Sequence, residues 1–344
     1  MAEEKRPVIR VVGSLNIDFV TLTPRVPGPG ETLTATSLSV NAGGKGANQA
    51  VACGRAAFVS KTEQDVRVEM IGAVGANDPY YASLLRPILE ESGVSTKGVT
   101  EITGSQTGTA TILVDEGAAG ENRILVVPGA NHAGMGDLPK IIDATAKNAE
   151  PDVVVMQGEI PRSTVLGLLK HFNSSNKTCV IFNPAPIFPA GIPLDALQGL
   201  AVLVVNETEC LQLFSVVEQL RAVDLPGEDD LSEAQLKRLT NQLHQVSGIT
   251  IVVVTLGARG VYYSNSGSDV RGMVAAIKVD RVVDTTGAGD TFVGYFATSL
   301  ARHLATGRTL ADFDTASAVG RANVAAAKCV QKAGAMQSIP FGYE

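Results

Sequence analysis

The chain has 344 residues, of which 45% are hydrophobic and only 18% charged, so it is long and apolar enough for a sizeable core and is not disordered. Its 35 glycines have no three-residue period, which excludes collagen and indicates places where bare backbone is needed. The net charge of −7 and the absence of any long apolar run argue against nucleic-acid and membrane partners. We expect a cytoplasmic protein and leave a nuclear location open, because the start of the chain has no signal-peptide pattern.

Short apolar runs alternate along the chain with longer segments of helical spacing. The strand-like runs cover residues 8–13, 69–75, 152–156, 178–182, 202–205 and 250–255. Helical patterns cover residues 79–92, 161–174 and 231–246, and the last opens on 230–233, which resembles a capping box. The alternation predicts an α/β fold, a mostly parallel sheet covered by helices on both faces. Ligands of such sheets bind at the carboxyl ends of the strands.

Two stretches, residues 19–40 and 107–127, alternate polar and apolar side chains instead. They predict a small antiparallel sheet that forms a lid over the strand ends, within a single domain spanning residues 1–344. The exposed edges of such a sheet could pair between subunits, so we expect a homodimer through the lid. The acidic segment 217–230 predicts a solvated surface insertion.

The sharpest motif is DTTGAGDTFVG at residues 284–294, which follows a strand-like stretch at 276–283 and leads into a small-residue helix at about 291–305. Small residues in such a turn let backbone N–H groups converge on an anion at the helix N-terminus. A carboxylate beside an anion site would repel the anion, so its presence needs an explanation. Asp290 is explained if it removes a proton from a hydroxyl that attacks a phosphoryl group. The alternative is a simple helix cap.

The second motif is NAGGKGANQA at residues 41–50. It does not fit the P-loop pattern, because Ser39 stands where the first glycine should be and Gly46 follows the lysine. Three glycines before a predicted helix, together with the amide of Asn48, suit a polyol better than a triphosphate. A tight turn without a ligand is the alternative.

Three shorter motifs follow predicted strands. Asn16 and Asp18 alternate onto one face and could bind neighbouring hydroxyls of one sugar, although an Asx turn would give the same pattern. The oxygens of Asn206 and Glu209 could hold a hydrated Mg²⁺, or simply begin a helix with acidic residues in its first turn. The glycine turn at residues 255–260 could admit a nucleotide, and is weak evidence by itself.

Together these motifs resemble the ribokinase family of sugar kinases, the PfkB-type carbohydrate kinases, over nearly the whole chain. Residues 284–294 resemble the C-terminal signature of the family and residues 41–50 its N-terminal signature, while NPAP at 183–186 and GAMQSIP at 334–340 are more similar to ribokinase than to its relatives. The resemblance implies a ribokinase-like fold and transfer of phosphate from ATP to the 5-hydroxyl of D-ribose. A fructokinase, a deoxyribose kinase and a catalytically silent sugar-binding protein are the alternatives.

The resemblance also implies roles for individual residues. Asp290 would be the general base, and the backbone of Gly287, Ala288 and Gly289 would form the anion hole. The implied sugar ligands are Asn16, Asp18, Gly44, Lys45, Asn48 and Glu159. The implied nucleotide-binding residues are Asn206, Thr255, Gly257, Gly260 and Asn323. Glu209 would place hydrated Mg²⁺, and an activating K⁺ would be held by Asp284, Thr286, Cys329, Lys332, Gly334 and Ser338.

Overall fold

The computed structural model describes residues 6–118, 121–147, 149–175, 177–221 and 230–344. Its main body is a sheet with the strand order β13-β12-β11-β10-β9-β8-β1-β4-β5. In chain order these strands are β1 (Val8–Val12), β4 (Arg67–Gly75), β5 (Val94–Ile102), β8 (Val153–Met156), β9 (Cys179–Phe182), β10 (Val202–Asn206), β11 (Ile251–Thr255), β12 (Val261–Asn265) and β13 (Val270–Val274). Neighbouring strands pair in parallel except where β12 runs antiparallel to both β11 and β13. The predicted mostly parallel α/β sheet is confirmed.

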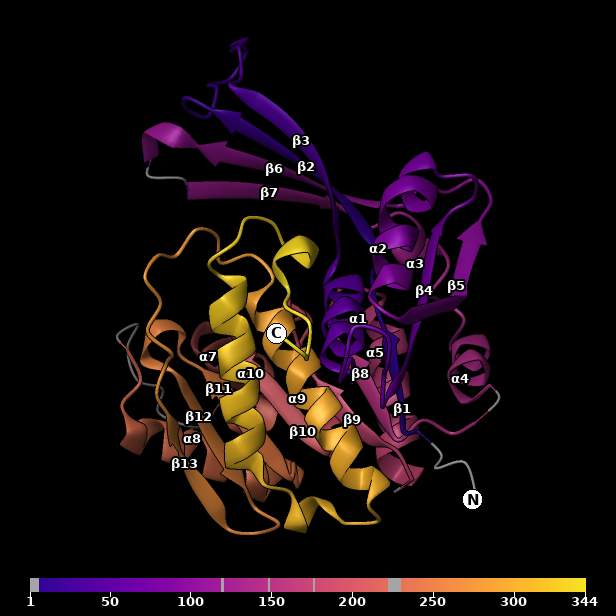
Figure 1. Cartoon of the computed structure of the whole chain (residues 1–344). Helices are drawn as coiled ribbons and strands as arrows, with labels where there is room; N and C mark the ends of the chain where they lie inside the picture. Colours follow the sequence, from indigo (N-terminus) through magenta and orange to yellow (C-terminus); the bar gives the residue numbers. More distant parts are fainter. Residues whose placement is uncertain (1–5, 119–120, 148, 176, 222–229) are drawn as a thin grey trace.

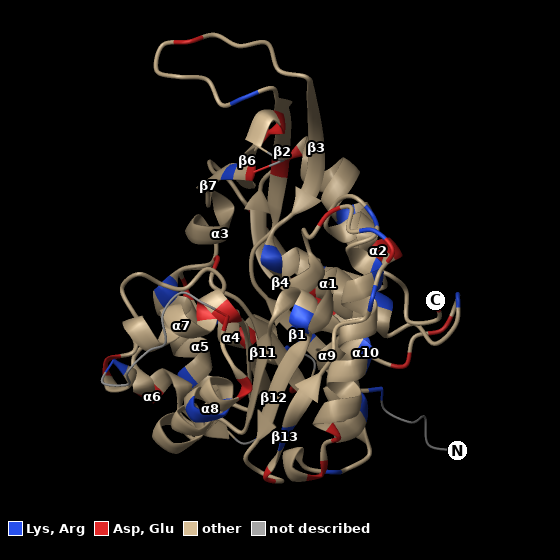
Figure 2. Cartoon of the chain, turned by 90° about the vertical axis from the view of Figure 1, so that its left-hand side faces the viewer, with Lys and Arg blue, Asp and Glu red and all other residues tan. Residues whose placement is uncertain are grey.

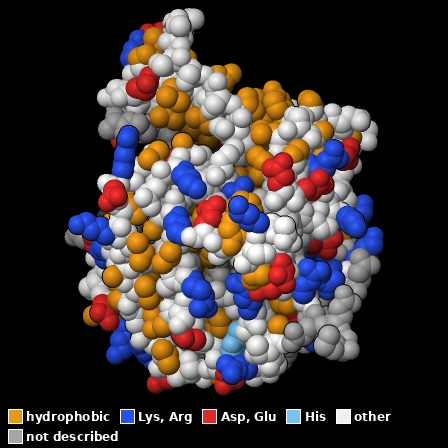
Figure 3. All heavy atoms as spheres, viewed as in Figure 1, with side chains coloured by type: hydrophobic (Ala, Val, Ile, Leu, Met, Phe, Trp, Pro, Cys, Tyr) orange, Lys and Arg blue, Asp and Glu red, His pale blue; other side chains and the backbone are white. Residues whose placement is uncertain are grey.

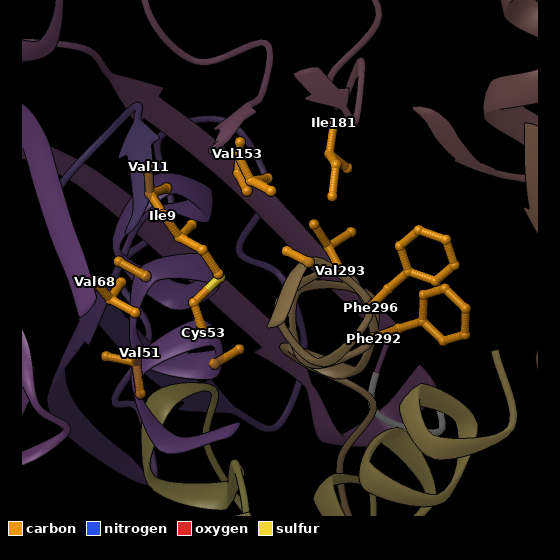
Figure 4. Packing of buried hydrophobic residues seen from close by; sticks show 14 of the residues in the cluster. Ile9, Val11, Val51, Cys53, Val68, Val153, Ile181, Phe292, Val293 and Phe296 are labelled. Carbon is orange, nitrogen blue, oxygen red and sulfur yellow. The ribbon is translucent and has the colours of Figure 1, made fainter. Parts of the chain in front are cut away.

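Helices bury both faces of this sheet, as Figure 1 shows. One face is covered by α1 (Lys45–Ala56), α2 (Arg86–Glu91), α9 (Ala288–Ala305) and α10 (Thr315–Cys329). The other is covered by α3 (Ala130–Ala133), α4 (Leu138–Ala146), α5 (Arg162–Ser175), α6 (Leu194–Leu197), α7 (Glu207–Val216) and α8 (Glu233–Ser247). Alternate side chains of one strand enter opposite cores: Ile9 and Val11 pack with the first group, shown in Figure 4, and Val12 with the second. This two-sided burial explains the continuous apolar runs in the sequence.

A second, four-stranded sheet forms a lid above the main body, at the top of Figure 1. Its strands, in spatial order, are β3 (Ser37–Gly43), β2 (Asn16–Thr23), β6 (Gly108–Asp115) and β7 (Glu121–Val127). Both outer pairings are antiparallel, as expected, but the central pairing of β2 with β6 is parallel. The reason is that β2 follows β1 and β6 follows β5, and both of those strands leave the main sheet in the same direction. The β2–β3 connection extends from the free end of the lid (Figure 2).

The strand-like stretch at residues 276–283 is not a strand. The last strand of the sheet is β13, and an irregular segment carries the chain from there to α9. The apolar side chains of Ile277, Val282 and Val283 are about half exposed, so they have no core to enter. The backbone N–H groups of Val283 and Asp284 instead donate to the carbonyl of Val330, beyond the end of α10. The alternating pattern therefore belongs to an irregular segment that is attached to the rest of the fold by a few hydrogen bonds.

Helix α8 begins two residues later than its sequence pattern indicates. Its N-cap is Ser232, which exchanges hydrogen bonds with Gln235 in a capping box. Leu231, just before it, is buried, and its N–H and carbonyl bind Glu207 and Arg259. These contacts hold residue 231 outside the helix.

The predicted surface insertion is only partly solvated. Residues 222–229 lie outside the described part of the chain, but Val217 and Leu220 at its start are buried in the second core. Within the described residues, no helix is long and apolar enough to cross a membrane. The cytoplasmic location stays a prediction.

Candidate active site

An open cleft of about 390 Å³ lies between the lid and the carboxyl ends of the central strands. Polar residues from distant parts of the chain meet here. The sequence-predicted residues that line it are Asn16, Asp18, Gly44, Lys45, Asn48, Glu159, Asn206, Glu209, Thr255, Thr286, Gly287, Gly289 and Asp290. The fold therefore brings residues of the N-terminal motif, the C-terminal motif and all three strand-end motifs to one place, as the sheet topology predicts.

The C-terminal motif forms the turn into α9 at the floor of this cleft. Gly287 is the N-cap, and its positive φ of 78° is a conformation that favours glycine. Ala288 and Gly289 open the helix, and a Cβ at Gly289 would meet no atom within 4 Å, so the space above this helix start is free. The start of α9 thus borders an open cleft, which is the place expected of an anion site.

Asp290 lies in the first turn of α9, is only 7% exposed and is not the helix cap. Its carboxylate is held from α1: Asn48 Nδ2 donates to Oδ2 and Gln49 Nε2 donates to Oδ1, each at 2.9 Å. These bonds cross between two motifs that are far apart in sequence. The simple capping alternative does not account for them, because Gly287 occupies the N-cap position.

Lys45 supplies positive charge beside Asp290. The attraction of Asp290 raises the pKa of the Lys45 ammonium, outweighing the opposing effect of burial, and Glu159 and Glu209 act in the same direction. The pKa of Glu209 is itself raised, mainly by burial. A charged lysine therefore lies among acidic groups in the cleft, where an anionic phosphate would bind.

At the sugar end predicted by the sequence, Asn16 and Asp18 project from the same face of β2. Asn131 Nδ2 donates to Asn16 Oδ1 at 2.7 Å, and the same amide is fixed by the backbone of Leu15. The glycine turn fits tightly around this strand: a Cβ at Gly43 would lie 2.1 Å from a carboxylate oxygen of Asp18. The glycines of the second motif therefore leave room for the side chains that are predicted to bind the sugar, as well as for a bound molecule.

Asp18 and Glu159 line the same cleft, and their charges interact. Glu159 is fixed by the backbone N–H of Lys45 at 2.9 Å and by the hydroxyl of Ser14. Burial, assisted by the charge of Glu159, raises the pKa of Asp18 to about 7. Asp18 therefore changes its charge close to neutral pH.

The strand-end motif of β10 is a helix cap that also lines the cleft. Asn206 N donates to Glu209 Oε2 at 2.9 Å, and Glu209 N donates to Asn206 Oδ1 at 2.7 Å, which is a complete capping box for α7. The alternative interpretation of this motif as a helix start is thus correct for its backbone. Both side chains nevertheless border the cleft, so the structural role does not remove the functional one.

Three predicted nucleotide-binding residues lie away from the cleft lining. Gly257 and Gly260 make the tight turn after β11, and a Cβ at Gly260 would lie 2.1 Å from the carbonyl oxygen of Val274. Asn323, on α10, donates its amide to the carbonyl of Ala275 at 2.8 Å and so anchors the irregular segment before α9. Each of these residues therefore has a structural task in the fold.

The residues predicted to hold a monovalent cation come together beside the catalytic turn. Asp284 is the link: its Oδ1 accepts from Thr286 N and its Oδ2 from Gly334 N, both at 2.9 Å. Across the loop, Cys329 Sγ lies 3.0 Å from Ser338 Oγ and both side chains are buried. The carbonyl of Cys329 accepts from Lys332 N at 3.1 Å.

The family model described as pfkB family carbohydrate kinase matches residues 7–341. The chain belongs to this family. Ribokinase from Schizosaccharomyces pombe is 35% identical over 339 residues, covering 96% of this chain and 94% of that protein. Deoxyribokinase from Salmonella typhi is 31% identical over 290 residues, 84% of each chain. The structure of Arabidopsis thaliana ribokinase complexed with ribose and ATP has a TM-score of 0.80 at 26% identity, covering 98% of this chain and 96% of that one.

The fold class, the ribokinase-like resemblance and the sugar-kinase activity predicted from the motifs are confirmed: this is an ATP-dependent sugar kinase of the pfkB family. Sequence reasoning missed several residues around its cleft. Apolar lid side chains border it, namely Ala110, Ile112, Ile124 and Val126. Gln49 and Asn183 stand inside the quoted motifs, but spacing alone did not distinguish them from ordinary buried amides.

The pKa of Asp18 predicts a pH-dependent sugar affinity for this kinase. An ionised carboxylate accepts hydrogen bonds from sugar hydroxyls at both oxygens and more strongly than a protonated carboxyl does, and in the free protein Asp18 becomes protonated as the pH falls through about 7. The KM for the sugar should therefore rise as the pH is lowered from 8 to 6. Steady-state KM values across this range test it, and the variant Asp18→Asn should lose the dependence. A wild-type KM that stays constant across the range would contradict this role for Asp18.

Proposed function

We propose that this kinase transfers the γ-phosphate of ATP to the 5-hydroxyl of D-ribose, producing ribose 5-phosphate and ADP. The observation that carries the proposal is that the buried carboxylate of Asp290 lines one cleft together with the polar pair Asn16 and Asp18 and the strand-end residues Asn206 and Thr255. The full-length similarity to ribokinases, one of them complexed with ribose and ATP, supports this substrate pair. The similarity to a deoxyribokinase makes 2-deoxyribose the second candidate.

Asp290 acts as general base in the proposed mechanism. As the sugar oxygen attacks the γ-phosphorus, its proton passes to the carboxylate of Asp290, and the bond from phosphorus to the β–γ bridging oxygen breaks to release ADP. In this mechanism the backbone N–H groups of Gly287, Ala288 and Gly289 would stabilise the charge that develops on the phosphoryl oxygens. Asp290 then returns its proton to solvent.

The lid excludes water from this reaction. Ile112, Ile124 and Val126 place apolar side chains on the side of the lid that faces the cleft. A lid closed over the sugar would leave the 5-hydroxyl as the sole acceptor near the phosphate, whereas an open cleft would admit water as a competitor. ADP release without sugar should accordingly be much slower than with it.

A coupled ADP-release assay over a panel of sugars tests the substrate. Ribose should give the highest kcat/KM among ribose, 2-deoxyribose, fructose and adenosine, with 2-deoxyribose lower by about tenfold or more. A site built to bind a hydroxyl is left with unpaired polar groups when the hydroxyl is missing. A higher kcat/KM for 2-deoxyribose would favour a deoxyribokinase, and one for fructose a fructokinase.

Glu209 is the residue proposed to place Mg²⁺, acting through water. The donor set fits a hard cation that keeps most of its waters, because Glu209 and Asn206 bring oxygen atoms to the same cleft. When bound with ATP, Mg²⁺ neutralises phosphate charge. Within the described residues there is no group of three or more His, Cys, Asp or Glu that could hold a metal directly.

A K⁺ ion is proposed for the loop beside the catalytic turn. Asp284 supplies a carboxylate, and the other ligands are the main-chain oxygens of Thr286, Cys329, Lys332 and Gly334 and the hydroxyl of Ser338. Asp284 already joins the two segments through its bonds to Thr286 N and Gly334 N. An all-oxygen set with one carboxylate suits a large monovalent cation, which would fix the turn leading into the anion hole.

Replacing K⁺ by Na⁺ should therefore lower kcat, by about fivefold or more. The measurement is the initial rate at saturating substrates in KCl, NaCl and CsCl of equal ionic strength. The variant Asp284→Asn should respond far less to the choice of salt. Equal wild-type rates in all three salts would contradict a specific cation site.

The lid also supports the expected homodimer. Leu38, Leu125 and Val127 are about half to two-thirds exposed, and by strand register they lie on the face of the lid opposite to the cleft. Figure 3 shows apolar side chains gathered on the lid. A second copy of this chain would cover this face, because apolar patches of this kind mark association sites. Light scattering should give about twice the chain mass of 35.8 kDa, and a monomer mass would contradict the proposal.

A further inference from the structure

Gln49 is fully buried, does not line the cleft and has no place in the mechanism above. Its side-chain nitrogen nevertheless makes two hydrogen bonds, to Asp290 Oδ1 at 2.9 Å and to Asn183 Oδ1 at 3.1 Å. Its side-chain oxygen accepts from Gln157 Nε2 at 2.7 Å. The amide of Gln49 therefore has a partner for each of its hydrogens and for its oxygen, and one of these partners is the proposed base.

The neighbours of Gln49 determine which end of its amide faces Asp290. Asn183 Nδ2 donates to the carbonyl of Val204 in β10 at 3.0 Å, which turns the oxygen of Asn183 toward Gln49. An oxygen at that place requires a donor, so the nitrogen of Gln49 must lie there. The chain of amides from the sheet backbone thus keeps an N–H directed at the carboxylate.

We propose that Gln49 is a positioning residue that orients the carboxylate of Asp290 for proton removal by donating a hydrogen bond to its Oδ1. The inference rests on the proposed role of Asp290 as base. Burial favours the protonated form of a carboxyl, which cannot accept a proton from the sugar, whereas a hydrogen bond donated to the carboxylate favours the ionised form. Asn48 provides one such donor and contacts the cleft; Gln49 provides the other from inside the core.

Other charges face Asp290 and have to be held constant in any test. Lys45 from α1 and Glu209 from α7 both interact electrostatically with it, and Glu159 interacts with Lys45 in turn. Asp18 titrates near pH 7 at the sugar end. Measuring kcat at saturating sugar and ATP keeps the titration of Asp18 in the free protein out of the profile, because kcat reports the pKa values of the substrate complex.

The variant Gln49→Met retains the length of the side chain and removes both donors. We expect the acidic limb of the kcat profile to move to higher pH by about one unit and kcat at pH 7 to fall about tenfold, with the KM for ribose changed less than about twofold. A purely structural role would lower kcat equally at every pH or raise KM. An unshifted acidic limb in folded Gln49→Met would overturn the proposal.

Gln64→Met is the matched control. Gln64 is a partly buried glutamine near α1 whose amide donates to the backbone carbonyls of Gly54 and Gly93 and not to Asp290, so this variant should leave the acidic limb in place. If Gln49→Met does not fold, Gln157→Met decides the question, because it leaves the donor on Gln49 and removes one of the partners that orient it. A smaller shift in the same direction supports the proposal, and no shift overturns it.

Asp290→Asn separates this inference from the assignment of the base. Near-normal turnover in Asp290→Asn would remove the base itself, whatever Gln49 does. A large loss there, combined with an unshifted profile in Gln49→Met, would retain Asp290 as base and reject only the positioning role of Gln49.

Discussion

Asp290→Asn is expected to lower kcat by at least about 10²–10⁴-fold, the usual contribution of a general base, while ribose still binds. The amide keeps the shape of the side chain but cannot take up the proton of the attacking hydroxyl. Binding should survive because the predicted sugar ligands Asn16 and Asp18 lie on the lid strand β2, on the other side of the cleft.

Turnover is measured by coupled ADP release, and ribose binding by calorimetry. The substitution also places an amide opposite the donors of Asn48 and Gln49, so a thermal melt has to show that the variant is folded. Turnover within a few-fold of wild type would contradict the assignment of Asp290, and a loss of ribose binding alone would point to a role in affinity instead.

Gly294→Ala is expected to destabilise the protein by about 1–3 kcal/mol, the usual cost of overpacking, and to reduce kcat as well. A Cβ at Gly294 would lie 2.3 Å from Ala52 Cβ and 2.6 Å from Cys53 N, so α1 and α9 would have to move apart. Figure 4 shows this core, with Cys53 of α1 and Val293 of α9 in one apolar cluster. Because α1 carries the amides that hold Asp290 of α9, separating the helices would stretch those hydrogen bonds.

Gly320→Ala provides the comparison for this variant. Gly320 also lies inside a helix, α10, but a Cβ there would meet no atom within 4 Å, so alanine should be neutral or stabilising by up to about 1 kcal/mol. Denaturant unfolding of both variants measures the difference. Equal stability of Gly294→Ala and wild type would show that the close approach of α1 to α9 is not required.

The parts of the molecule that could be predicted from the sequence are those determined by local patterns. Apolar runs such as the one in β11 identify buried strands, and in a parallel sheet the residues that follow such strands meet at one edge. For this reason the sequence predicts that Thr255 and Asn206 lie in the same site as Asp290. The glycines of the two motifs are also predictable from local pattern, because only glycine readily adopts a positive φ such as that of Gly287.

The parts that could not be predicted depend on contacts between distant segments. The parallel pairing in the centre of the lid follows from where β1 and β5 leave the main sheet, which no local pattern records. The alternation around Ile277 is the same as that of a strand, but no neighbouring strand is there to pair with it. The contact of Gln49 with Asp290 joins residues 241 positions apart, so it becomes visible only once α1 and α9 are packed.

The most direct measurement of the central claim is the identity of the product formed from ribose and ATP. Incubation of the protein with ¹³C-labelled ribose, Mg²⁺ and K⁺, followed by phosphorus and carbon NMR, shows which carbon carries the phosphate. The account predicts ribose 5-phosphate in equal amount to ADP, and 5-deoxyribose, which lacks only the attacking hydroxyl, should inhibit without being phosphorylated. Phosphate on carbon 1, or no phosphorylated ribose at all, would contradict it.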